Sequence, residues 1–533
     1  MKPPTLTSQG PGLASVHRNE KPPFKIAIVG VGPRGGFALE EIARLYRKKE
    51  MAENIDIHLY ERDDYPGAGP VYNPRQAEYL KMNFASGNID ARPDISGRSL
   101  CDWLERNHPQ CSAPTQFIPR AWVGQYLSET LEETLASLPD SITVTLHKGS
   151  VTSVTRVGGN WRLSLGGSAQ CFDEVLVTVG HGQWKRHTER ELPDISKVKI
   201  FKAFPVDQNL TEEVIPAGSR VATKGYALTW IDSVLALTEG RGGTFEESGG
   251  RLSYKPSGKE PECITPFSRS GKPLLSKPDL SVRKRSESFN EKARALSAEL
   301  KESVKNQRQI DFRATVWPLL TELAQSQCSD EDVQVWLDDW MSEETFSTRS
   351  LTELRRSYEV AIGKAEPGPA YAWGEAWRRL YPDIVRCVSH GRIDPSSWEF
   401  FQTVATEMER LSFGPPACNV RKILCLIDCG LVDVSSPANV PESADQVVDT
   451  TIPQPTAVSD DSLLGTMIAE LELERDVVTG GLKVDSAGYV RPGLAVLGRV
   501  CEGWILGHDT LNRTLHSELN HWTDRLLQRV STS

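Results

Sequence analysis

The feature that most constrains this chain is an apolar run that leads directly into a glycine-rich turn. Residues 24–29 predict a buried parallel strand, and Gly30, Gly32 and Gly35 follow it with the spacing G-x-G-x-x-G. A helical apolar pattern comes next. In this order Gly30 permits the tight turn, Gly32 lets the backbone approach a pyrophosphate, and Gly35 lets the helix pack close to the strand. The candidate cofactor-binding residues of this loop are Gly30, Gly32, Pro33, Arg34 and Gly35.

An acidic residue stands at the second position that such a site needs. Residues 55–61 alternate as a second strand would, and Glu61 closes that strand. A carboxylate there can accept hydrogen bonds from both ribose hydroxyls of an adenosine, while the helix N-terminus offers free N–H groups to phosphates. The alternative is a glycine-rich turn in an α/β domain that binds no nucleotide. The order of strand, glycines, helix and acid favours nucleotide binding.

The composition limits the class of protein. A chain of 533 residues is too long for one core and predicts two or three domains. Its net charge of −10 argues against non-specific binding to nucleic acid and against docking on anionic membranes. There is no apolar run of about 18 residues, so we expect no membrane span. Residues 1–21 are polar and have no hydrophobic signal core, which predicts a disordered tail on a cytoplasmic protein.

The cysteine and histidine spacings argue against two further kinds of site. The ten cysteines include no C-x-x-C pair, which a thioredoxin-type disulfide reductase needs. The ten histidines include no H-x-x-x-H or H-E-x-x-H pair, so we expect no metal site. The partner that we expect is a small-molecule substrate, and the sequence leaves the oligomeric state open.

Two strand–turn–helix units in one chain predict an α/β fold with two dinucleotide sites. The predicted strands of the first unit end at Gly180, and the second unit begins with a strand over 220–224 followed by Gly225. A charge-rich helical region follows, then a predicted strand over 494–498 and a long closing helix over 508–530. The expected parts are a disordered tail (1–22), a first dinucleotide-binding part (23–216), a second one (217–285), a helical lobe (286–411) and a return to the first domain (412–533).

The order of these pieces resembles the FAD-NAD(P)-binding family of two-site flavoproteins, distant relatives of the N-hydroxylating and Baeyer–Villiger flavin monooxygenases. The resemblance covers nearly all of residues 24–527. No single piece is specific, but their order is. The matching pieces are residues 30–35, 67–72, 82–83, 119–120, 179–181, 225–232, 237–243, 254–261, 268–271, 414–416 and 498–509.

The resemblance implies FAD at the first site, in a Rossmann-like domain that is interrupted by a second, NAD(P)-type Rossmann-like domain with a helical insertion. The chain would leave the first sheet after Gly180 and return to it at Gly498. The closing helix, with Asp509 or Thr510 as N-cap, would point its N-terminus at the flavin pyrimidine ring and stabilise negative charge there. A plain C-terminal packing helix is the alternative. Gly180, Gly498 and Thr510 are thus candidate cofactor-binding residues.

The second site departs from the family pattern. Relatives carry G-x-G where this chain has Gly-Tyr-Ala at 225–227, and Trp230 takes a position that is normally small. The methyl group of Ala227 and the bulk of Trp230 argue against nicotinamide binding. Arg269 favours it, because it follows the next predicted strand and can pair with the 2′-phosphate of NADP. A surface ion pair is the alternative for Arg269. The candidate residues for NADPH are Gly225, Thr229 and Arg269.

These expectations favour an FAD-dependent oxidoreductase, most concretely an NADPH-dependent monooxygenase that acts on a small molecule. The cofactor carries such chemistry and needs no side-chain nucleophile, so the sequence leaves the catalytic residues open. Asn83 and Arg120 are candidates near the flavin by family position; turn capping also explains Asn83, and binding of the FAD pyrophosphate also explains Arg120. Two alternatives stay open: a flavin oxidase or dehydrogenase that does not use NADPH, and a non-catalytic FAD-binding protein whose helical lobe contacts a partner.

Overall fold

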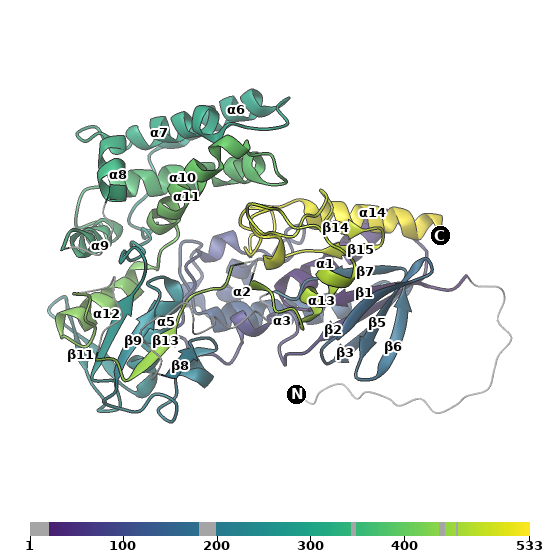
Figure 1. Ribbon diagram of the computed structural model, residues 1–533, viewed down its shortest axis with the longest axis horizontal. Helices are drawn as coiled ribbons and strands as arrows, with labels where there is room; N and C mark the ends of the chain where they lie inside the picture. The colour runs from purple at the N-terminus through teal and green to yellow at the C-terminus, as the bar shows by residue number, and fades with distance from the viewer. Residues whose placement is uncertain (1–20, 181–198, 343–347, 436–442, 455–456) are drawn as a thin grey trace.

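The computed structural model describes residues 21–180, 199–342, 348–435, 443–454 and 457–533. Two parallel sheets and a helical lobe make up this part of the chain. Figure 1 shows the first sheet at the right, the second sheet at the lower left and the lobe above the second sheet. The expected α/β fold is therefore confirmed. Residues 1–20 of the predicted tail and His181 of the predicted strand end lie outside the described residues.

The first sheet places the glycine-rich turn near its centre. Its strand order is β14-β15-β7-β1-β2-β3, and every neighbouring pair except β14–β15 is parallel. A parallel strand in the middle of a sheet is covered on both faces, which explains why β1 is an unbroken apolar run. The bounds are β1 Phe24–Val29, β2 Ile55–Glu61, β3 Ile142–Lys148, β7 Glu174–Val177, β14 Tyr489–Arg491 and β15 Leu494–Val496.

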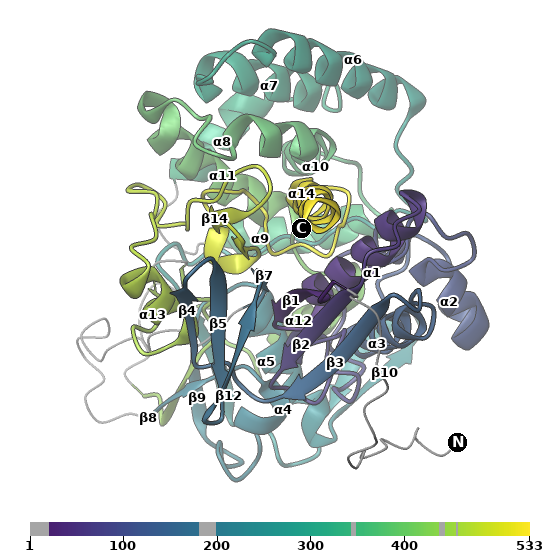
Figure 2. The ribbon, with the colours of Figure 1, turned by 90° about the vertical axis from the view of Figure 1, so that its right-hand side faces the viewer.

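Helices cover one face of this sheet and a three-stranded antiparallel meander covers the other (Figure 2). Ile28 packs in the cluster that holds Leu39 of α1 and Trp522 of α14, whereas Ala27 packs in the cluster that holds Trp161 of the meander. Successive residues of β1 thus serve opposite faces. The bounds are α1 Pro33–Lys48, α2 Leu100–Asn107, α3 Arg120–Ala136, α14 Glu518–Thr532, β4 Ser153–Val157, β5 Asn160–Leu165 and β6 Ser168–Phe172.

The second sheet has four parallel strands in the order β12-β9-β13-β8. Helices α5 and α12 pack on it, because Trp230 of α5 and Ile423 of α12 share a core with Val221 of β9. The bounds are β8 Lys199–Lys202, β9 Arg220–Lys224, β12 Cys263–Phe267, β13 Gln446–Asp449, α4 Val206–Asn209, α5 Leu228–Leu237 and α12 Ala417–Asp428, with a hairpin of β10 Thr244–Ser248 and β11 Arg251–Lys255 beside them.

The parts of the chain that build the second sheet differ from the expected ones. β8 falls in the part expected as 23–216 and β13 in the part expected as 412–533, yet both strands pair in the second sheet. The chain returns to the first sheet only after Asp449, by way of α13 (Leu463–Glu470). A strand of four residues has the same apolar pattern in either sheet, so its sequence does not indicate its neighbours.

The helical lobe has a core rich in tryptophan. Trp340, Trp373 and Trp377 are almost fully buried there, which is the usual place of tryptophans at helical spacing. They offer no surface to a partner. The helices of the lobe are α6 Glu287–Val304, α7 Trp317–Gln325, α8 Val333–Ser342, α9 Thr348–Ala361, α10 Pro369–Val388 and α11 Trp398–Ser412.

The lobe contacts the first domain through the C-terminal end of α10. Ser389 Oγ accepts a hydrogen bond from Leu506 N at 3.0 Å, and the His390 ring is hydrogen-bonded to Glu518 at 2.7 Å. Because α12 follows α11 and packs on the second sheet, the lobe bridges both dinucleotide-binding parts. In the described part of the chain, no helix combines the length and the apolar character that crossing a membrane requires.

Candidate active site

Three glycines meet at the carboxyl end of the first sheet. Gly30, Gly180 and Gly498 follow β1, β7 and β15, which are neighbours in the sheet. All three have positive φ, at 92°, 62° and 107°, which favours glycine. The carboxyl ends of parallel strands are where ligands bind in such sheets. The structure therefore brings these three sequence-predicted residues to one edge.

The glycines of the first loop differ in what surrounds them. A Cβ on Gly30 would lie 2.7 Å from Thr178 O, and a Cβ on Gly35 would lie 2.3 Å from Gly30 O. A Cβ on Gly32 would meet only Gly69 Cα, at 3.9 Å. Gly30 and Gly35 are thus required by the close approach of protein segments, whereas the space beside Gly32 is open for a ligand.

Helices α1 and α5 both begin without a side-chain cap. Their N-cap residues are Gly32 and Ala227, and neither helix has an acidic residue in its first turn. By contrast, Ser99, Ser286 and Ser462 cap α2, α6 and α13 with their side-chain oxygens. The first N–H groups of α1 and α5 therefore stay available to an anion such as a pyrophosphate.

Glu61 lies beside the glycine loop, as its position at the end of β2 predicts. Its carboxylate accepts hydrogen bonds from Val31 N at 2.7 Å and from Asp63 N at 2.9 Å. Each carboxylate oxygen can accept a second hydrogen bond, so both can still receive ribose hydroxyls. The open space at Gly32, the uncapped helix α1 and Glu61 together fit FAD.

Arg34 and His508 join the glycine loop to the C-terminal segment. Arg34 Nη2 donates to His508 O at 2.6 Å, and Gly498 N donates to His508 Nδ1 at 3.3 Å. Burial, with the positive charge of Arg34, holds the pKa of His508 well below its usual range. The ring is therefore neutral and carries its proton on Nε2, which has no hydrogen-bond partner among the described residues.

The closing helix begins later than the sequence predicts. α14 starts at Glu518, and residues 508–517 are irregular. The expectation that Asp509 or Thr510 caps a helix aimed at the flavin is therefore wrong. Thr510 Oγ1 accepts a hydrogen bond from the backbone two residues on, which competes with helix formation, and Arg513 pairs with two buried carboxylates of α1.

The loop between β9 and α5 forms the candidate second site. Gly225 has φ 110°, and a Cβ there would lie 2.6 Å from Thr450 Oγ1. Ala227 is exposed. Trp230 is only 1% exposed and packs edge-on against Tyr226, with ring centres 4.5 Å apart. The bulk of Trp230 is thus accommodated in the core of the second sheet.

Arg269 and Thr229 lie on either side of this loop. Arg269 comes two residues after β12, which pairs with β9 in parallel register, and Gly225 N donates to Phe267 O at 2.8 Å. The Arg269 side chain is exposed, and no ion pair within the described chain holds it. Thr229 lies half-buried in the first turn of α5. The two residues therefore lie close to the β9–α5 loop, and their role in binding a nicotinamide dinucleotide stays a prediction.

Asn83 and Arg120 both reach across to other parts of the molecule. Asn83 Nδ2 donates to Phe413 O at 3.0 Å, at the end of α11. Arg120 forms an ion pair with Asp232 of α5, and its Nε is buried without a partner among the described residues. These contacts join the first domain to the lobe and to the second domain, and they put both residues at the junction of the three parts.

Two buried ionisable groups at this junction were not predicted. Burial lowers the pKa of Lys277 to about 7, and burial with the charge of Asp509 raises the pKa of Glu502 to about 8. Glu502 accepts hydrogen bonds from the backbone of residues 507 and 508, and so fixes the segment that contacts Arg34. Charged residues in loops are mostly solvated, so their sequence positions gave no signal of burial.

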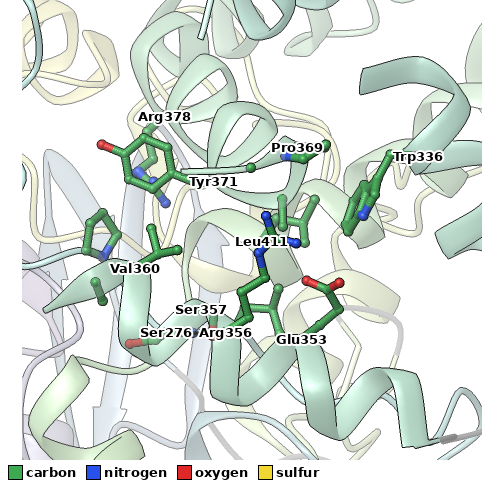
Figure 3. Close-up of a pocket in the computed structure, with 15 residues that line it drawn as sticks. Ser276, Trp336, Glu353, Arg356, Ser357, Val360, Pro369, Tyr371, Arg378 and Leu411 are labelled. Carbon is green, nitrogen blue, oxygen red and sulfur yellow. Dashed lines mark hydrogen bonds between the residues drawn. The ribbon is translucent and has the colours of Figure 1, made fainter. Parts of the chain in front are cut away.

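Figure 3 shows a pocket between the helices of the lobe and the segment that contains Ser276. Trp336, Arg356, Tyr371 and Arg378 are among its lining residues, and none of its lining residues belongs to β1, α1, β9 or α5. This pocket is therefore not a dinucleotide site.

Comparisons with known proteins agree with this geometry. Residues 27–182 match the family model described as FAD-NAD(P)-binding. The chain is similar to L-aspartate N-monooxygenase (nitrosuccinate-forming) of Streptomyces davaonensis, with 25% identity over 503 residues that cover 77% of this chain and 76% of the relative. It is also similar to nitrosuccinic acid synthase of Aspergillus oryzae, with 23% identity over 498 residues that cover 77% and 73% of the two chains.

A solved structure shares the whole fold. The reduced form of ornithine hydroxylase from Pseudomonas aeruginosa superposes with a TM-score of 0.51 at 10% identity, over 95% of this chain and 100% of that chain. The comparisons confirm the predicted FAD-NAD(P)-binding domain, the predicted fold and the predicted flavin chemistry. The individual site residues stay predictions.

Proposed function

We propose that this chain, an FAD-dependent monooxygenase with an FAD-NAD(P)-binding domain over residues 27–182, oxidises the amine nitrogen of an acidic amino acid. The observation that carries the proposal is the extent of similarity to two relatives named for oxidation of L-aspartate or formation of nitrosuccinate, which covers 77% of the chain. That similarity covers much more of the chain than residues 27–182, which match the family model.

In this proposal the first loop holds FAD. The open space at Gly32 would accommodate the pyrophosphate, and the first turn of α1 would donate its free N–H groups to it. Glu61 accepts the ribose hydroxyls while it keeps its bond to Val31 N. His508, neutral and buried beside Gly498, holds the C-terminal segment against the loop.

The second loop holds NADPH. The first turn of α5 donates to the pyrophosphate near Gly225 and Thr229, and Arg269 pairs with the 2′-phosphate. FAD bound there would supply the oxygen-activating chemistry after its reduction by NADPH. One atom of O₂ enters an N–H bond of the substrate, the other leaves as water, and NADPH supplies the two electrons.

The protein contributes orientation and the exclusion of water. The junction of the two domains and the lobe is closed by the contacts of Asn83 with Phe413 and of Arg120 with Asp232. A closed junction protects activated oxygen from wasteful reaction with water. The lobe therefore acts as a cover over the substrate.

Turnover by purified protein tests this proposal. We expect NADPH consumption to rise when L-aspartate is added, with an N-oxidised product formed in step with the NADPH consumed. L-Asparagine, which lacks one carboxylate, and L-ornithine are the matched control substrates, and both should stimulate weakly. Rapid flavin reduction by NADPH with no amino acid oxidised would refute the proposed substrate class. If only an organic substrate reduced the flavin, the oxidase alternative would hold, which Ala227 and Trp230 favour.

A further inference from the structure

Lys277 is a buried lysine that touches all three parts of the molecule. It follows β12, its backbone N donates to Pro415 O at 2.8 Å, and its Nζ donates to Asn83 O at 2.6 Å. The residue is 8% exposed. Its Nζ lies 5.5 Å from the ring centres of both Phe84 and Phe413. The ammonium group therefore sits at the junction, beside the stretch that includes Asn83.

No carboxylate of the described residues pairs with Lys277. The charged groups that act on it are Arg378, Glu375 and Arg285. Glu375 is fully buried and forms ion pairs with both arginines, with Arg378 Nη2 at 2.5 Å. One carboxylate thus neutralises one of two guanidinium groups, and Lys277 adds a further positive charge. The cluster carries an excess of buried positive charge.

Such an excess is unfavourable unless an anion joins the cluster. Burial, followed by repulsion from Arg378, lowers the pKa of Lys277 to about 7, which measures how poorly the charge is compensated. An ammonium group has three donors, and only one of them has an acceptor within the described chain. A carboxylate ligand would supply both the missing charge and the missing acceptors.

We propose that Lys277 binds a carboxylate of the substrate, and that Arg378 and Arg285 supply the positive field that favours an acidic amino acid over a neutral one. This inference rests on the proposed function, because the bound carboxylate would place the amine near Asn83 and the flavin. A phosphate group of the nicotinamide dinucleotide is the other anion that this chemistry could accept. The experiment separates the two.

The test is the dissociation constant of succinate, measured by calorimetry on flavin-loaded protein. Succinate has the two carboxylates of L-aspartate and no amine. Lys277→Met should raise its Kd roughly 10- to 100-fold, the range expected for loss of a charge-assisted hydrogen bond. Lys277→Arg should keep most of the affinity. Lys277→Gln retains a donor to Asn83 O and should lose affinity for succinate as Lys277→Met does. It serves as the test if the methionine variant does not fold.

Lys272→Met is the matched control. Lys272 is also buried, donates to a backbone carbonyl (Trp340 O) and lies over an aromatic ring, but within the lobe. This variant should leave the Kd of succinate unchanged. An unchanged Kd in both Lys277→Met and Lys277→Gln, or no binding of succinate to the wild type, would overturn the proposal. If the Lys277 variants raised the Kd of NADP⁺ but not the Kd of succinate, the cluster would be assigned to the nucleotide. That result would also overturn the proposal.

The outcomes keep this inference distinct from the proposed function. If succinate binds through Lys277 but no amino acid is oxidised, the carboxylate site stands and the proposed function falls. If L-aspartate is oxidised and Lys277→Met leaves its KM unchanged, the proposed function stands and the carboxylate site falls.

Discussion

At the scale of single residues, the glycines of the first loop fall into two kinds: those that protein packing requires and one that lies beside open space. At position 35, a Cβ would collide with the carbonyl oxygen of Gly30. At position 32, a Cβ would enter open space. Gly32 has φ −73°, which any residue can adopt. The pattern G-x-G-x-x-G therefore predicted the turn correctly, and the structure distinguishes Gly32, which lies beside open space, from Gly30 and Gly35, which lie against the protein.

Gly32→Ala should purify as a folded but flavin-poor protein, because its methyl group occupies the space of the pyrophosphate. Gly35→Ala should lose stability instead, by about 1–3 kcal/mol as for other overpacked sites. Flavin absorbance and thermal unfolding measure the two effects. Full flavin content in Gly32→Ala, together with normal stability, would show that the pyrophosphate does not lie there.

Lys277 predicts a pH dependence of ligand binding. Its protonated form binds the carboxylate, so the affinity for succinate should be highest below the lysine pKa of about 7 and fall as the pH rises through it. Two arginines, Arg378 and Arg285, act on Lys277, and guanidinium groups in proteins are in general always charged. Although burial opposes it, their charges hold the pKa of Glu375 below its usual value, so Glu375 stays ionised. Lys277 is thus the group that titrates.

The measurement is the Kd of succinate against pH in wild type and in Lys277→Arg. Far above pH 7 the wild-type Kd should rise about tenfold per pH unit, as for a single proton. The arginine variant stays charged and should bind with no such change. A fall in affinity of equal size in both proteins would assign the titration to another group.

At the scale of elements, helices α1 and α5 share the kind of start that a dinucleotide loop needs. Both follow a glycine with positive φ, at Gly30 and Gly225, and both leave their first N–H groups without a side-chain acceptor. The second loop differs in Ala227, which stands where the first loop has Gly32, and in its Tyr226–Trp230 pair, which fills the core below it. This difference leaves the phosphate-binding end of α5 open.

Arg269→Ala should raise the KM for NADPH roughly 10- to 100-fold and leave the KM for NADH nearly unchanged, because only NADPH carries the 2′-phosphate. Steady-state NADPH and NADH oxidation measure this. Arg269 is exposed and unpaired in the described chain, so the variant should fold as the wild type does. Equal changes with both nucleotides would remove Arg269 from this role.

The elements around the first loop could be predicted from sequence, whereas the pairing of β8 and β13 and the start of α14 could not. The strand and helix around Gly30 have strong apolar periodicity, so their type and order were correct. β8 and β13 have four residues each, and their pairing depends on tertiary neighbours that no local pattern reveals. The start of α14 was placed ten residues early, because Thr510 and Arg513 bond outside a helix.

At the scale of the whole molecule, the packing of the lobe on both domains determines which residues meet at the junction. Sequence periodicity predicted a helical lobe, but it did not indicate that Lys277, Arg378 and Asn83 would meet. These residues come from a loop, from α10 and from the first domain, and only the packing of the three parts brings them together. The residues of the candidate cofactor loops lie close together in sequence, whereas the substrate site that we propose is assembled from distant segments.

Oxidation of L-aspartate in heavy-isotope dioxygen tests the central claim most directly. Protein loaded with FAD is supplied with NADPH and L-aspartate, and the amino-acid product is analysed by mass spectrometry. We predict that an oxygen atom from dioxygen appears on the amine nitrogen, and that NADPH is required. NADPH oxidation that yields only peroxide, or a product with no oxygen from dioxygen on nitrogen, would contradict the account.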